Sequence, residues 1–307
     1  MDAITEKIWM DGTFVDWNQA NVHILTHTLH YGWGVFEGIR CYQCADGSSA
    51  VFRLKEHVDR LFDSAHIVSI PVPYTREQIS EAILETLRVN KVKEAYIRPI
   101  IFIGDGEMGI YVKKLNVRVA IAVWGWGAYL GAEGLNKGIR AKVASYTRLH
   151  VNAQMTKAKV VGNYVNSILA KREVIVAGYD EAIMLDTAGY VSEASGENVF
   201  FVKNGTIKTT PLQSILPGIT RDSVLTIVRD KGYPLREERF TRDELYLAEE
   251  AFFSGTAAEI TPIREVDNRM IGPGIPGPIT SDVQATFFDT VRGKVDRYRS
   301  WLTPVYA

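Results

Sequence analysis

Two lysines stand directly ahead of a Gly-Asn-Tyr turn in the stretch KAKVVGNYVNSILA, and they are the first candidates for catalysis. An amine that is partly neutral and held against a carbonyl can form a Schiff base. Lys159 precedes a predicted helix, whose N-terminus carries partial positive charge and therefore favours the neutral amine. Spacing alone does not choose between Lys157 and Lys159, because most lysines are solvated surface residues. The expected apolar face of the helix consists of Val161, Val165, Ile168 and Leu169.

The residues downstream add the remaining parts of such a site. The stretch YVSEASGENVFF places Glu193 and Glu197 in an apolar, strand-like setting, where an unpaired carboxylate would be costly. Gly218 directly precedes a predicted helix, and the stretch SGTAA surrounds Thr256 with small residues, so both offer backbone amides to an anion. A lysine, a buried acid and two anion-binding turns are the parts that a pyridoxal phosphate site requires.

Strands and helices must position these residues, and the first half of the chain predicts both. Alternating residues indicate a hairpin that turns at Asp11-Gly12, and GWGVFEGIRCY reads as a strand. Residues 54–69 show helical spacing, and Thr75 with Gln78 forms a capping box ahead of a second helix. AYIRPIIFI and VRVAIAVWGW then read as strands.

The second half predicts a similar mixture. IRAKVASY, EAIMLD, YVSEASGENVFFV and GTIKTTP read as strands, and helices are expected after Lys159, over 220–231 and near 281–293. Thr241 and Glu244 form another capping box. The fold class is therefore α+β in two domains.

The glycine-rich stretch at residues 125–138 shows little periodicity and predicts a linker. The expected division is an N-terminal α/β domain over 1–124, this linker, and a C-terminal domain over 139–307 that carries both lysines. Because the linker contains Trp126 and Tyr129, we expect it to border a binding cleft.

Composition excludes several classes of function. Of the 307 residues, 35 are Lys or Arg and 36 are Asp or Glu, so no broad basic face for nucleic acid is expected. No apolar run is long enough to span a bilayer, and the N-terminus lacks the pattern of an export signal. The two cysteines, Cys41 and Cys44, have no second Cys/His pair to complete a zinc site and read as structural thiols in a reducing cytoplasm.

Three further motifs favour structural interpretations. The G-x-G-x-x-G match at 104–109 lacks the following helix that a dinucleotide site needs. The Asn204 sequon lies between alternating runs and is better read as an Asn-Gly hairpin turn. His27 and His30 have no third ligand placed by the sequence, so no metal is expected.

Seven motifs together indicate a family. HYGWGVFEGIR, EHVDRLFDSA, AYIRP, KVVGNY, SEASGENVF, LPGITRD and SGTAAEITP occur in family order and at family spacing over nearly the whole chain. The sequence resembles the branched-chain amino acid aminotransferases of fold type IV, the D-amino acid aminotransferase-like fold of enzymes that use pyridoxal 5′-phosphate. The resemblance implies transamination between leucine, isoleucine or valine and 2-oxoglutarate, as in the biosynthesis of branched-chain amino acids, and it leaves open whether the chain serves their synthesis or their breakdown.

The resemblance also assigns the cofactor residues. It selects Lys159 as the Schiff-base lysine and general acid/base, Tyr164 as donor to the cofactor's phenolic oxygen, and Glu193 as partner of the pyridinium nitrogen. Leu216 would pack on the ring face. The residues that would bind the phosphate, or line the turns that do, are Arg60, Gly218, Ile219, Thr220, Gly255 and Thr256.

The substrate pocket follows from the same resemblance. Its wall would consist of Phe36, Tyr96, Trp126 and Tyr129, with Tyr31 contributed across a homodimer. Arg98 would receive the distal carboxylate of glutamate, since its planar fork matches a carboxylate. The substrate α-carboxylate would bind the amides of Thr256, Ala257 and Ala258.

Other interpretations stay open at this stage. D-amino acid aminotransferases, (R)-selective amine transaminases and aminodeoxychorismate lyases share the architecture, and a scaffold protein without catalysis is a remote alternative. Glu107 and Met108 lie in a loop that varies within the family, so the side-chain preference is open. The expected partners are small amino acids and 2-oxo acids and at least one further copy of the chain, with no nucleic acid and no membrane.

Overall fold

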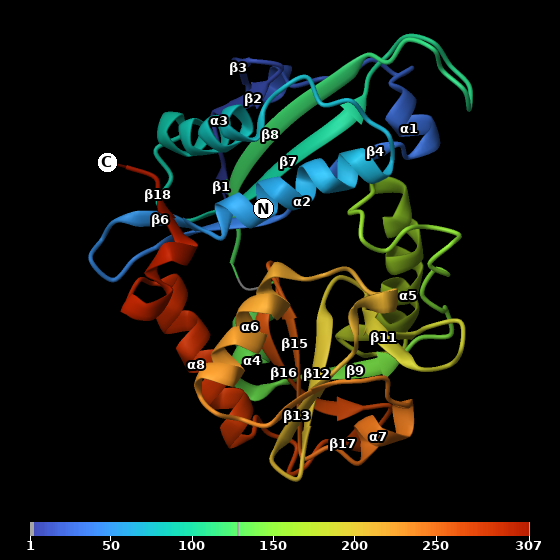
Figure 1. The fold of residues 1–307 in the computed structure, drawn as a ribbon, viewed down its shortest axis with the longest axis vertical. Coiled ribbons are helices and arrows are strands. Elements are labelled where there is room, and N and C mark those ends of the chain that lie inside the picture. The colour runs from blue at the N-terminus through green and yellow to red at the C-terminus, as the bar shows by residue number, and fades with distance from the viewer. Residues whose placement is uncertain (1–2, 128, 307) are drawn as a thin grey trace. The chain divides into compact units, whose positions relative to one another are not determined.

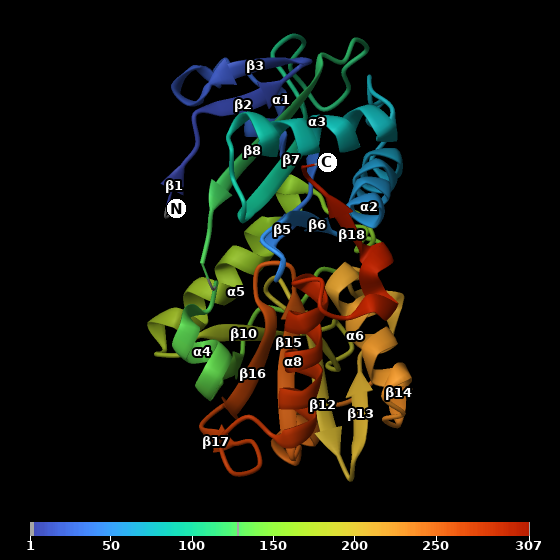
Figure 2. The same cartoon turned by 90° about the vertical axis from the view of Figure 1, so that its left-hand side faces the viewer.

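The computed structural model describes residues 3–127 and 129–306 and divides the chain into two compact units. The chain enters each unit more than once. Unit 1 comprises residues 1–126, 158–163 and 290–307, and unit 2 comprises residues 127–157 and 164–289. Within each unit, helices cover a β-sheet, as Figures 1 and 2 show. The arrangement agrees with the expected α+β class.

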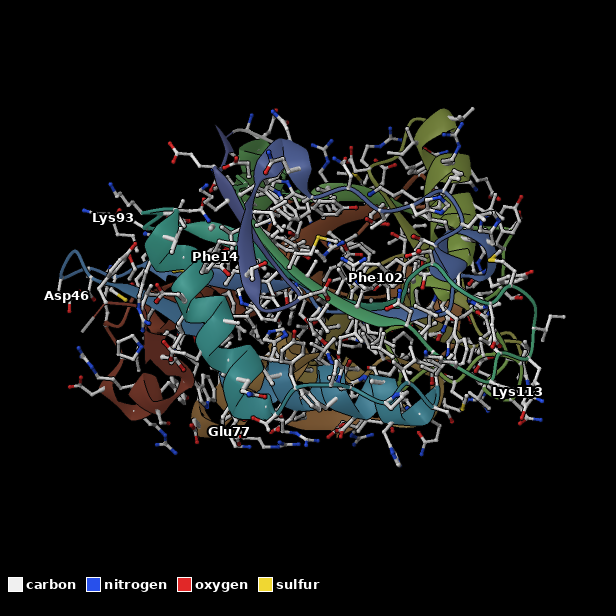
Figure 3. All side chains as sticks on the ribbon, turned by 90° about the horizontal axis from the view of Figure 1, so that it is seen from above. Phe14, Asp46, Glu77, Lys93, Phe102 and Lys113 are labelled. Carbon is white, nitrogen blue, oxygen red and sulfur yellow. The ribbon has the colours of Figure 1, made fainter. Side chains whose placement is uncertain are left out.

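Unit 1 is an antiparallel sheet covered by two long helices. Its elements are β1 (Ala3–Ile4), β2 (Lys7–Met10), β3 (Thr13–Asp16), η1 (Trp17–Gln19), α1 (His27–Tyr31), β4 (Gly34–Phe36), β5 (Ile39–Gln43), β6 (Ser49–Phe52), α2 (Leu54–Ile67), α3 (Arg76–Val89), β7 (Ala95–Ile103), β8 (Val117–Gly125), η2 (Val161–Asn163), η4 (Asp296–Trp301) and β18 (Leu302–Pro304). The sheet order is β18-β6-β5-β7-β8-β2-β3, with β1 paired to β8 and β4 to β7. Apolar side chains of α2 and α3 complete the core against this sheet. Figure 3 marks Glu77 in the first turn of α3 and Phe102 on β7.

Unit 2 is a mixed sheet. Its elements are α4 (Gly131–Lys137), β9 (Ile139–Val143), α5 (Tyr164–Val176), β10 (Glu181–Leu185), β11 (Val191–Ala194), β12 (Asn198–Lys203), β13 (Thr206–Thr209), η3 (Leu212–Ser214), α6 (Ile219–Asp230), β14 (Leu235–Glu237), α7 (Arg242–Tyr246), β15 (Glu250–Gly255), β16 (Glu259–Val266), β17 (Arg269–Met270) and α8 (Pro278–Val291), whose last two residues fall in unit 1. The order is β11-β10-β9-β16-β15-β12-β13-β14, with β17 paired to β16. Strand β9 runs parallel to both of its neighbours.

Local sequence signals explain several of these elements. The Gln78 amide donates to Thr75 Oγ1 at 3.2 Å while Gln78 Oε1 accepts from the Thr75 amide, which confirms the predicted capping box of α3. Positive φ angles at Asn204 and Gly205 make the two-residue turn between β12 and β13. The structure therefore confirms the hairpin that was predicted at the sequon.

The two compact units differ from the predicted domain ranges. The C-terminal strand β18 pairs with β6, so the end of the chain belongs to unit 1. Val160 forms an antiparallel bridge with Val35, and this pairing brings residues 158–163 into unit 1 as well. The stretch that was predicted to be a linker contains helix α4, which packs on β16 of unit 2.

The predicted apolar face of helix α5 lies on the outside of the single chain. Val165, Ile168 and Leu169 on this face are exposed at 59%, 53% and 42%. The buried residues of α5 are Ser167, Ala170 and Val174. Small side chains let the helix lie close to β9 and β10, which leaves the larger apolar side chains on the outside.

Within the described residues, no helix combines the length and the apolar character needed to cross a membrane. The same residues hold no group of three or more His, Cys, Asp or Glu side chains suited to a metal ion.

Candidate active site

Lys159 is held in unit 1 by its own backbone. Its amide donates to Ser64 Oγ on α2 at 3.0 Å, and its carbonyl accepts from the Phe36 amide on β4 at 3.1 Å. The next residue, Val160, forms the bridge to Val35. The lysine therefore extends from a short backbone segment that is held on two sides, by α2 and by β4.

A close crossing of two glycines fixes the chain just after Lys159. The Gly162 amide donates to the Gly32 carbonyl at 3.1 Å. A Cβ atom on Gly32 would lie 2.8 Å from the Gly162 Cα, and Gly32 has a φ of +68°. Only glycine satisfies both conditions at Gly32, so the GWG stretch serves to anchor the lysine segment.

One aromatic ring connects the lysine with an arginine. Lys159 Nζ lies 5.0 Å from the centroid of the Phe36 ring, and the Arg98 guanidinium lies 4.6 Å from the same centroid. Arg98 Nη2 donates to the Tyr96 hydroxyl at 3.1 Å, and the Tyr96 ring packs on Trp126 with centroids 4.4 Å apart. Unit 1 thus brings together four of the predicted pocket residues and the candidate catalytic amine.

Arg98 retains hydrogen-bonding capacity in this aromatic cluster. Its Nε atom is buried and has no hydrogen-bond partner among the described residues. A guanidinium presents its N–H donors in a planar fork. Its geometry therefore suits a carboxylate from a ligand.

Gly38 shapes the aromatic cluster, and the sequence analysis did not single it out. A Cβ atom on Gly38 would lie 2.0 Å from the Tyr96 hydroxyl oxygen. Only the absence of a side chain at this position lets Tyr96 point its hydroxyl toward Arg98. The signal was present in FEGIR, where a glycine interrupts two strand-like runs.

A fully buried acid lies next to the lysine segment. Both Glu37 oxygens accept from Arg60, at 2.6 Å from Nε and 2.9 Å from Nη2, and Oε2 also accepts from His57 Nδ1 at 2.7 Å. Burial opposes the charge on Glu37, but Arg60 and His57 more than offset it and hold the Glu37 pKa well below its usual range. Burial lowers the pKa of His57, so the neutral imidazole donates this hydrogen bond. Arg60, a predicted phosphate ligand, is thereby fixed in orientation.

His57 makes the stability of the protein sensitive to acid. In the unfolded chain an ordinary histidine gains a proton below about pH 6.5, whereas buried His57 resists it, so stability falls as the pH drops through this value. Glu37 acts in the same direction at lower pH, because its depressed pKa stabilises the fold above the unfolded value and this contribution is lost on acidification. We expect the fall in Tm between about pH 7.5 and 5 to be about 3 °C smaller in His57→Gln than in the natural protein.

Calorimetry at a series of pH values measures this difference. His66→Gln is the matched control, because His66 lies on the same helix but is exposed. The control should keep the natural slope of Tm against pH. Parallel curves for His57→Gln and the natural protein would contradict the prediction.

Glu193 is buried in unit 2 and paired with a cation. It lies on β11 and is 4% exposed. Its Oε1 accepts from Arg148 Nε at 2.7 Å, and its Oε2 accepts from the Leu216 amide at 3.1 Å and from Asn198 Nδ2 at 3.4 Å. These donors offset the cost of burying the carboxylate.

The start of α6 offers an anion site. Within the described residues, no side-chain cap hydrogen bond is made at Gly218, the N-cap of a helix whose first residues are Ile219 and Thr220. A Cβ atom on Gly218 would lie 2.0 Å from Asn198 Oδ1, which explains the glycine. A phosphate would be stabilised here by the positive end of the α6 dipole, by the backbone amides of the first turn and by the Thr220 hydroxyl.

The second predicted anion turn lies beside the first. Gly255 ends β15, and the turn Thr256–Ala258 leads into β16. Ser254, the neighbour of Gly255, pairs with Asn198 on β12. Because Asn198 also contacts the α6 start through the Leu216 carbonyl, both turns border the same end of the sheet.

The structure separates the two candidate lysines. Lys157 belongs to unit 2, where its Nζ donates to the Leu212 carbonyl and, at 3.0 Å, to the Ile215 carbonyl. Burial lowers the Lys157 pKa, although Glu193 partly opposes this effect. Lys157 therefore binds and stabilises the segment before Leu216. Lys159 is the better candidate for the catalytic amine.

Two predicted pocket residues, Tyr31 and Tyr129, make ring contacts outside the aromatic cluster of Phe36, Tyr96, Arg98 and Trp126. Tyr31, on α1, packs on the His27 ring with centroids 4.5 Å apart, and His27 Nε2 lies 2.8 Å from the Gly109 carbonyl oxygen. This contact joins Tyr31 to the 104–110 loop. Tyr129 belongs to unit 2, where Lys171 Nζ lies 5.4 Å from its ring centroid.

Comparisons with known proteins agree in pointing to one group. Residues 34–266 match the family described as amino-transferase class IV. A branched-chain-amino-acid aminotransferase of Pseudomonas aeruginosa is 53% identical over 298 residues, which cover 97% of each chain. The crystal structure of the Escherichia coli branched-chain amino acid aminotransferase matches with a TM-score of 0.96 at 45% identity, over 98% of this chain and 100% of the other. The enzyme of the same name from Thermobaculum terrenum, solved in its pyridoxal phosphate form, matches with a TM-score of 0.93 at 33% identity, over 99% and 100%.

Proposed function

The chain belongs to the class IV aminotransferases, as a branched-chain amino acid aminotransferase that uses pyridoxal 5′-phosphate, and on this premise we propose which residues perform the reaction. Lys159 binds the cofactor covalently and transfers the proton at the substrate Cα. The observation that supports this role is the Phe36 ring, which has the Lys159 amine and the Arg98 guanidinium as neighbours. Assays of L-leucine, D-alanine and a chorismate-type substrate side by side test whether the chain acts as a branched-chain amino acid aminotransferase, and only L-leucine should react well.

The chemistry of the donors fits the cofactor. Three donors bind Glu193 in the described structure, and a carboxylate can accept about four hydrogen bonds, so capacity remains for a protonated pyridine nitrogen. When bound, the cofactor supplies an electron-withdrawing ring that stabilises negative charge at the substrate Cα. We propose that the other residues in contact with it are Arg60, Tyr164, Leu216, Gly218, Ile219, Thr220, Gly255 and Thr256.

The protein contributes orientation and proton transfer. With the cofactor bound, the free Lys159 amine would act as general base toward the proton on the substrate Cα and would return that proton as general acid. Tyr164 would donate a hydrogen bond to the cofactor's phenolic oxygen, and Glu193 would hold a proton on its ring nitrogen. The amides of Thr256, Ala257 and Ala258 bind the substrate α-carboxylate.

The pocket must accept an aliphatic side chain and the second carboxylate of glutamate. We propose that Phe36, Tyr96, Trp126 and Tyr129 provide apolar area, with Tyr31 from a second copy of the chain. Arg98 binds the distal carboxylate of glutamate or 2-oxoglutarate, which is supported by its Nε atom having no hydrogen-bond partner among the described residues. Aliphatic substrates have no group for Arg98.

Arg98→Ala is expected to separate the two amino donors. We expect kcat/KM for L-glutamate to fall by about 100-fold, because a charge-assisted bidentate contact is lost, and kcat/KM for L-leucine to fall by less than about fivefold. Half-reaction kinetics with each amino acid measure both values.

Arg118→Ala is the matched control for this experiment. Arg118 lies on the neighbouring strand β8 and pairs with Asp11 outside the aromatic cluster. This variant should keep the natural ratio of glutamate to leucine activity. An equal loss for both amino acids in Arg98→Ala would refute the role of Arg98.

We further propose a homodimer. Large apolar side chains around α1 and the 104–110 loop are exposed, and we expect a second copy to cover them. These residues are Ile24, Leu29, Tyr31, Met108, Ile110 and Tyr111. A monomer in analytical ultracentrifugation at micromolar concentration would contradict this proposal.

The cysteines support a reducing compartment, and we propose the cytoplasm. Cys41 and Cys44 are both free thiols. Burial raises the pKa of Cys41 to about 12, so this thiol is not a nucleophile near neutral pH.

A further inference from the structure

Arg148 lies beside the proposed cofactor residues but has no part in the proposed reaction. It belongs to the segment that follows β9, and its side chain is 14% exposed. Its Nε donates to Glu193 Oε1 at 2.7 Å, and its Nη1 donates to Ser167 Oγ at 3.2 Å. A single guanidinium therefore connects strand β11 with helix α5.

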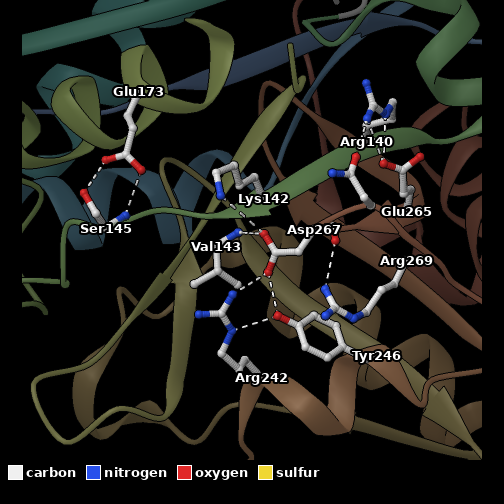
Figure 4. A network of polar contacts seen from close by, with 11 residues as sticks. Arg140, Lys142, Val143, Ser145, Glu173, Arg242, Tyr246, Glu265, Asp267 and Arg269 are labelled. Atoms are coloured by element: carbon white, nitrogen blue, oxygen red, sulfur yellow. Dashed lines mark hydrogen bonds and ion pairs between the residues drawn. The ribbon is translucent and has the colours of Figure 1, made fainter. Parts of the chain in front are cut away.

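The backbone around Arg148 is anchored as firmly as its side chain. The Arg148 amide donates to the Leu185 carbonyl of β10 at 2.7 Å. Asn166 Nδ2 on α5 donates to the Thr147 carbonyl at 3.0 Å, and the Ser145 amide donates to Glu173 Oε1 at 2.9 Å, the contact drawn in Figure 4. The guanidinium thus starts from a fixed point between β10 and α5.

The α5 end of this link lies in the helix turn that begins with Tyr164. Asn166 and Ser167 follow Tyr164 by two and three residues, and Ser167 is 4% exposed. Under the proposed function, Tyr164 faces the phenolic oxygen of the pyridine ring and Glu193 faces its nitrogen. The ring is rigid, so these two partners must keep a fixed separation, to within about 0.5 Å.

We propose that Arg148 is a positioning residue that fixes the Glu193 carboxylate relative to the first turn of α5, so that Glu193 meets the nitrogen and Tyr164 the phenolic oxygen of one pyridine ring. This inference rests on the proposed function. Arg148 itself touches neither cofactor nor substrate and acts through Glu193.

The chemistry of arginine explains why this residue type is needed. Its Nε and Nη1 are separate donors in one rigid plane, so it can bond a carboxylate and a hydroxyl at a defined angle. A lysine retains the charge but not the plane. Without a cation, the buried Glu193 would keep only the Leu216 amide and Asn198 as partners, both on Oε2, and would be free to turn.

Binding of two cofactors tests the proposal. The first is pyridoxal 5′-phosphate, and the second is its 1-deaza analogue, in which carbon replaces the ring nitrogen. Apoprotein is titrated with each. We expect Arg148→Gln to weaken binding of pyridoxal phosphate by about 10- to 100-fold, as is typical when a group that orients a ligating side chain is removed. Binding of the analogue should change by less than about threefold, because it makes no hydrogen bond to Glu193.

Two further variants define the comparison. In Arg148→Lys, the ratio of the affinity for pyridoxal phosphate to that for the analogue should lie between the values of the natural protein and Arg148→Gln, because lysine keeps the charge but not the planar donors. Arg239→Gln is the matched control, because it removes an arginine that pairs with Asp186 in the same unit, and it should keep the natural preference. Circular dichroism of the apoprotein shows whether Arg148→Gln folds. If it does not fold, Arg148→Lys is compared with the natural protein instead, and an unchanged ratio of the two cofactor affinities in this variant would overturn the proposal.

A nitrogen NMR measurement gives a readout independent of affinity. With cofactor labelled by ¹⁵N at the ring nitrogen, the natural protein should show the chemical shift of a pyridinium nitrogen. In Arg148→Gln, this chemical shift should move toward that of neutral pyridine. Equal weakening of both cofactors, or an unchanged nitrogen signal, would overturn the proposal. A natural protein that shows no preference for pyridoxal phosphate would instead refute the pairing of Glu193 with the ring nitrogen, and the role of Arg148 with it.

Discussion

Replacement of Lys159 by alanine is expected to abolish transamination between L-leucine and 2-oxoglutarate, with kcat falling by about 10⁴-fold or more. The variant loses both the covalent attachment of the cofactor and the base that moves the Cα proton. Because backbone hydrogen bonds of Lys159 with Ser64 and Phe36 hold the segment and do not depend on the side chain, the segment should keep its place in unit 1. Steady-state kinetics with L-leucine measures the loss.

Lys157→Ala is the control that separates the two neighbouring amines. It removes the donors to the Leu212 and Ile215 carbonyls and should lower thermal stability, but the cofactor should still attach to the protein. Borohydride reduction followed by peptide mass spectrometry should find the pyridoxyl group on Lys159 in this variant. An adduct on any other residue, or near-normal turnover by Lys159→Ala, would refute the assignment.

Glu193→Gln is expected to produce the second largest loss. Glutamine is neutral and cannot stabilise a protonated ring nitrogen, so the ring withdraws electrons less well and kcat should fall by about 10²- to 10³-fold. The substitution also leaves Arg148 without its carboxylate, and the loss of one partner of a buried pair typically costs about 3–5 kcal/mol of stability. Stopped-flow absorbance of the half-reaction with L-leucine measures the chemical step directly.

Glu197→Gln is the matched control, because Glu197 lies four residues away, in the short segment between β11 and β12, and is similarly buried. It makes an Oε2 contact with the Gly196 amide, which a glutamine oxygen can also accept. We expect a loss of at most about tenfold. Similar losses in the two variants would show that burial, and not the position opposite the ring nitrogen, explains the effect.

Local sequence patterns predicted much of the fold and the main site motifs. The capping box at Thr75, the hairpins at Asp11-Gly12 and Asn204-Gly205, and the glycine before α6 each depend on residues a few positions apart. Such short-range signals reflect backbone preferences and are visible in a single sequence. The resemblance added the roles, which no local pattern contains.

The contacts that the sequence could not predict join distant residues. Arg148 pairs with Glu193 across 45 positions of the chain, and nothing in the sequence near Arg148 marks it as a partner. The spacing of apolar residues on α5 located an apolar face, but it could not show that Ser167, Ala170 and Val174 would be the buried residues, because hydrophobic spacing shows where a face lies but not what covers it. Likewise, pairing of Val160 with Val35 decided the unit to which Lys159 belongs, and strand pairing of this kind depends on tertiary structure.

The path of the backbone between the units restricts how this enzyme can be divided. The chain passes from one unit to the other after residues 126, 157, 163 and 289. The segment that contains Lys159, residues 158–163, contributes six residues to unit 1 between two segments of unit 2. A gene fragment that ends at residue 126 would therefore encode the aromatic pocket without its amine and without the edge strand β18. A single recombination breakpoint between residues 126 and 158 would combine the aromatic pocket of one relative with the lysine segment of another, although both belong to unit 1.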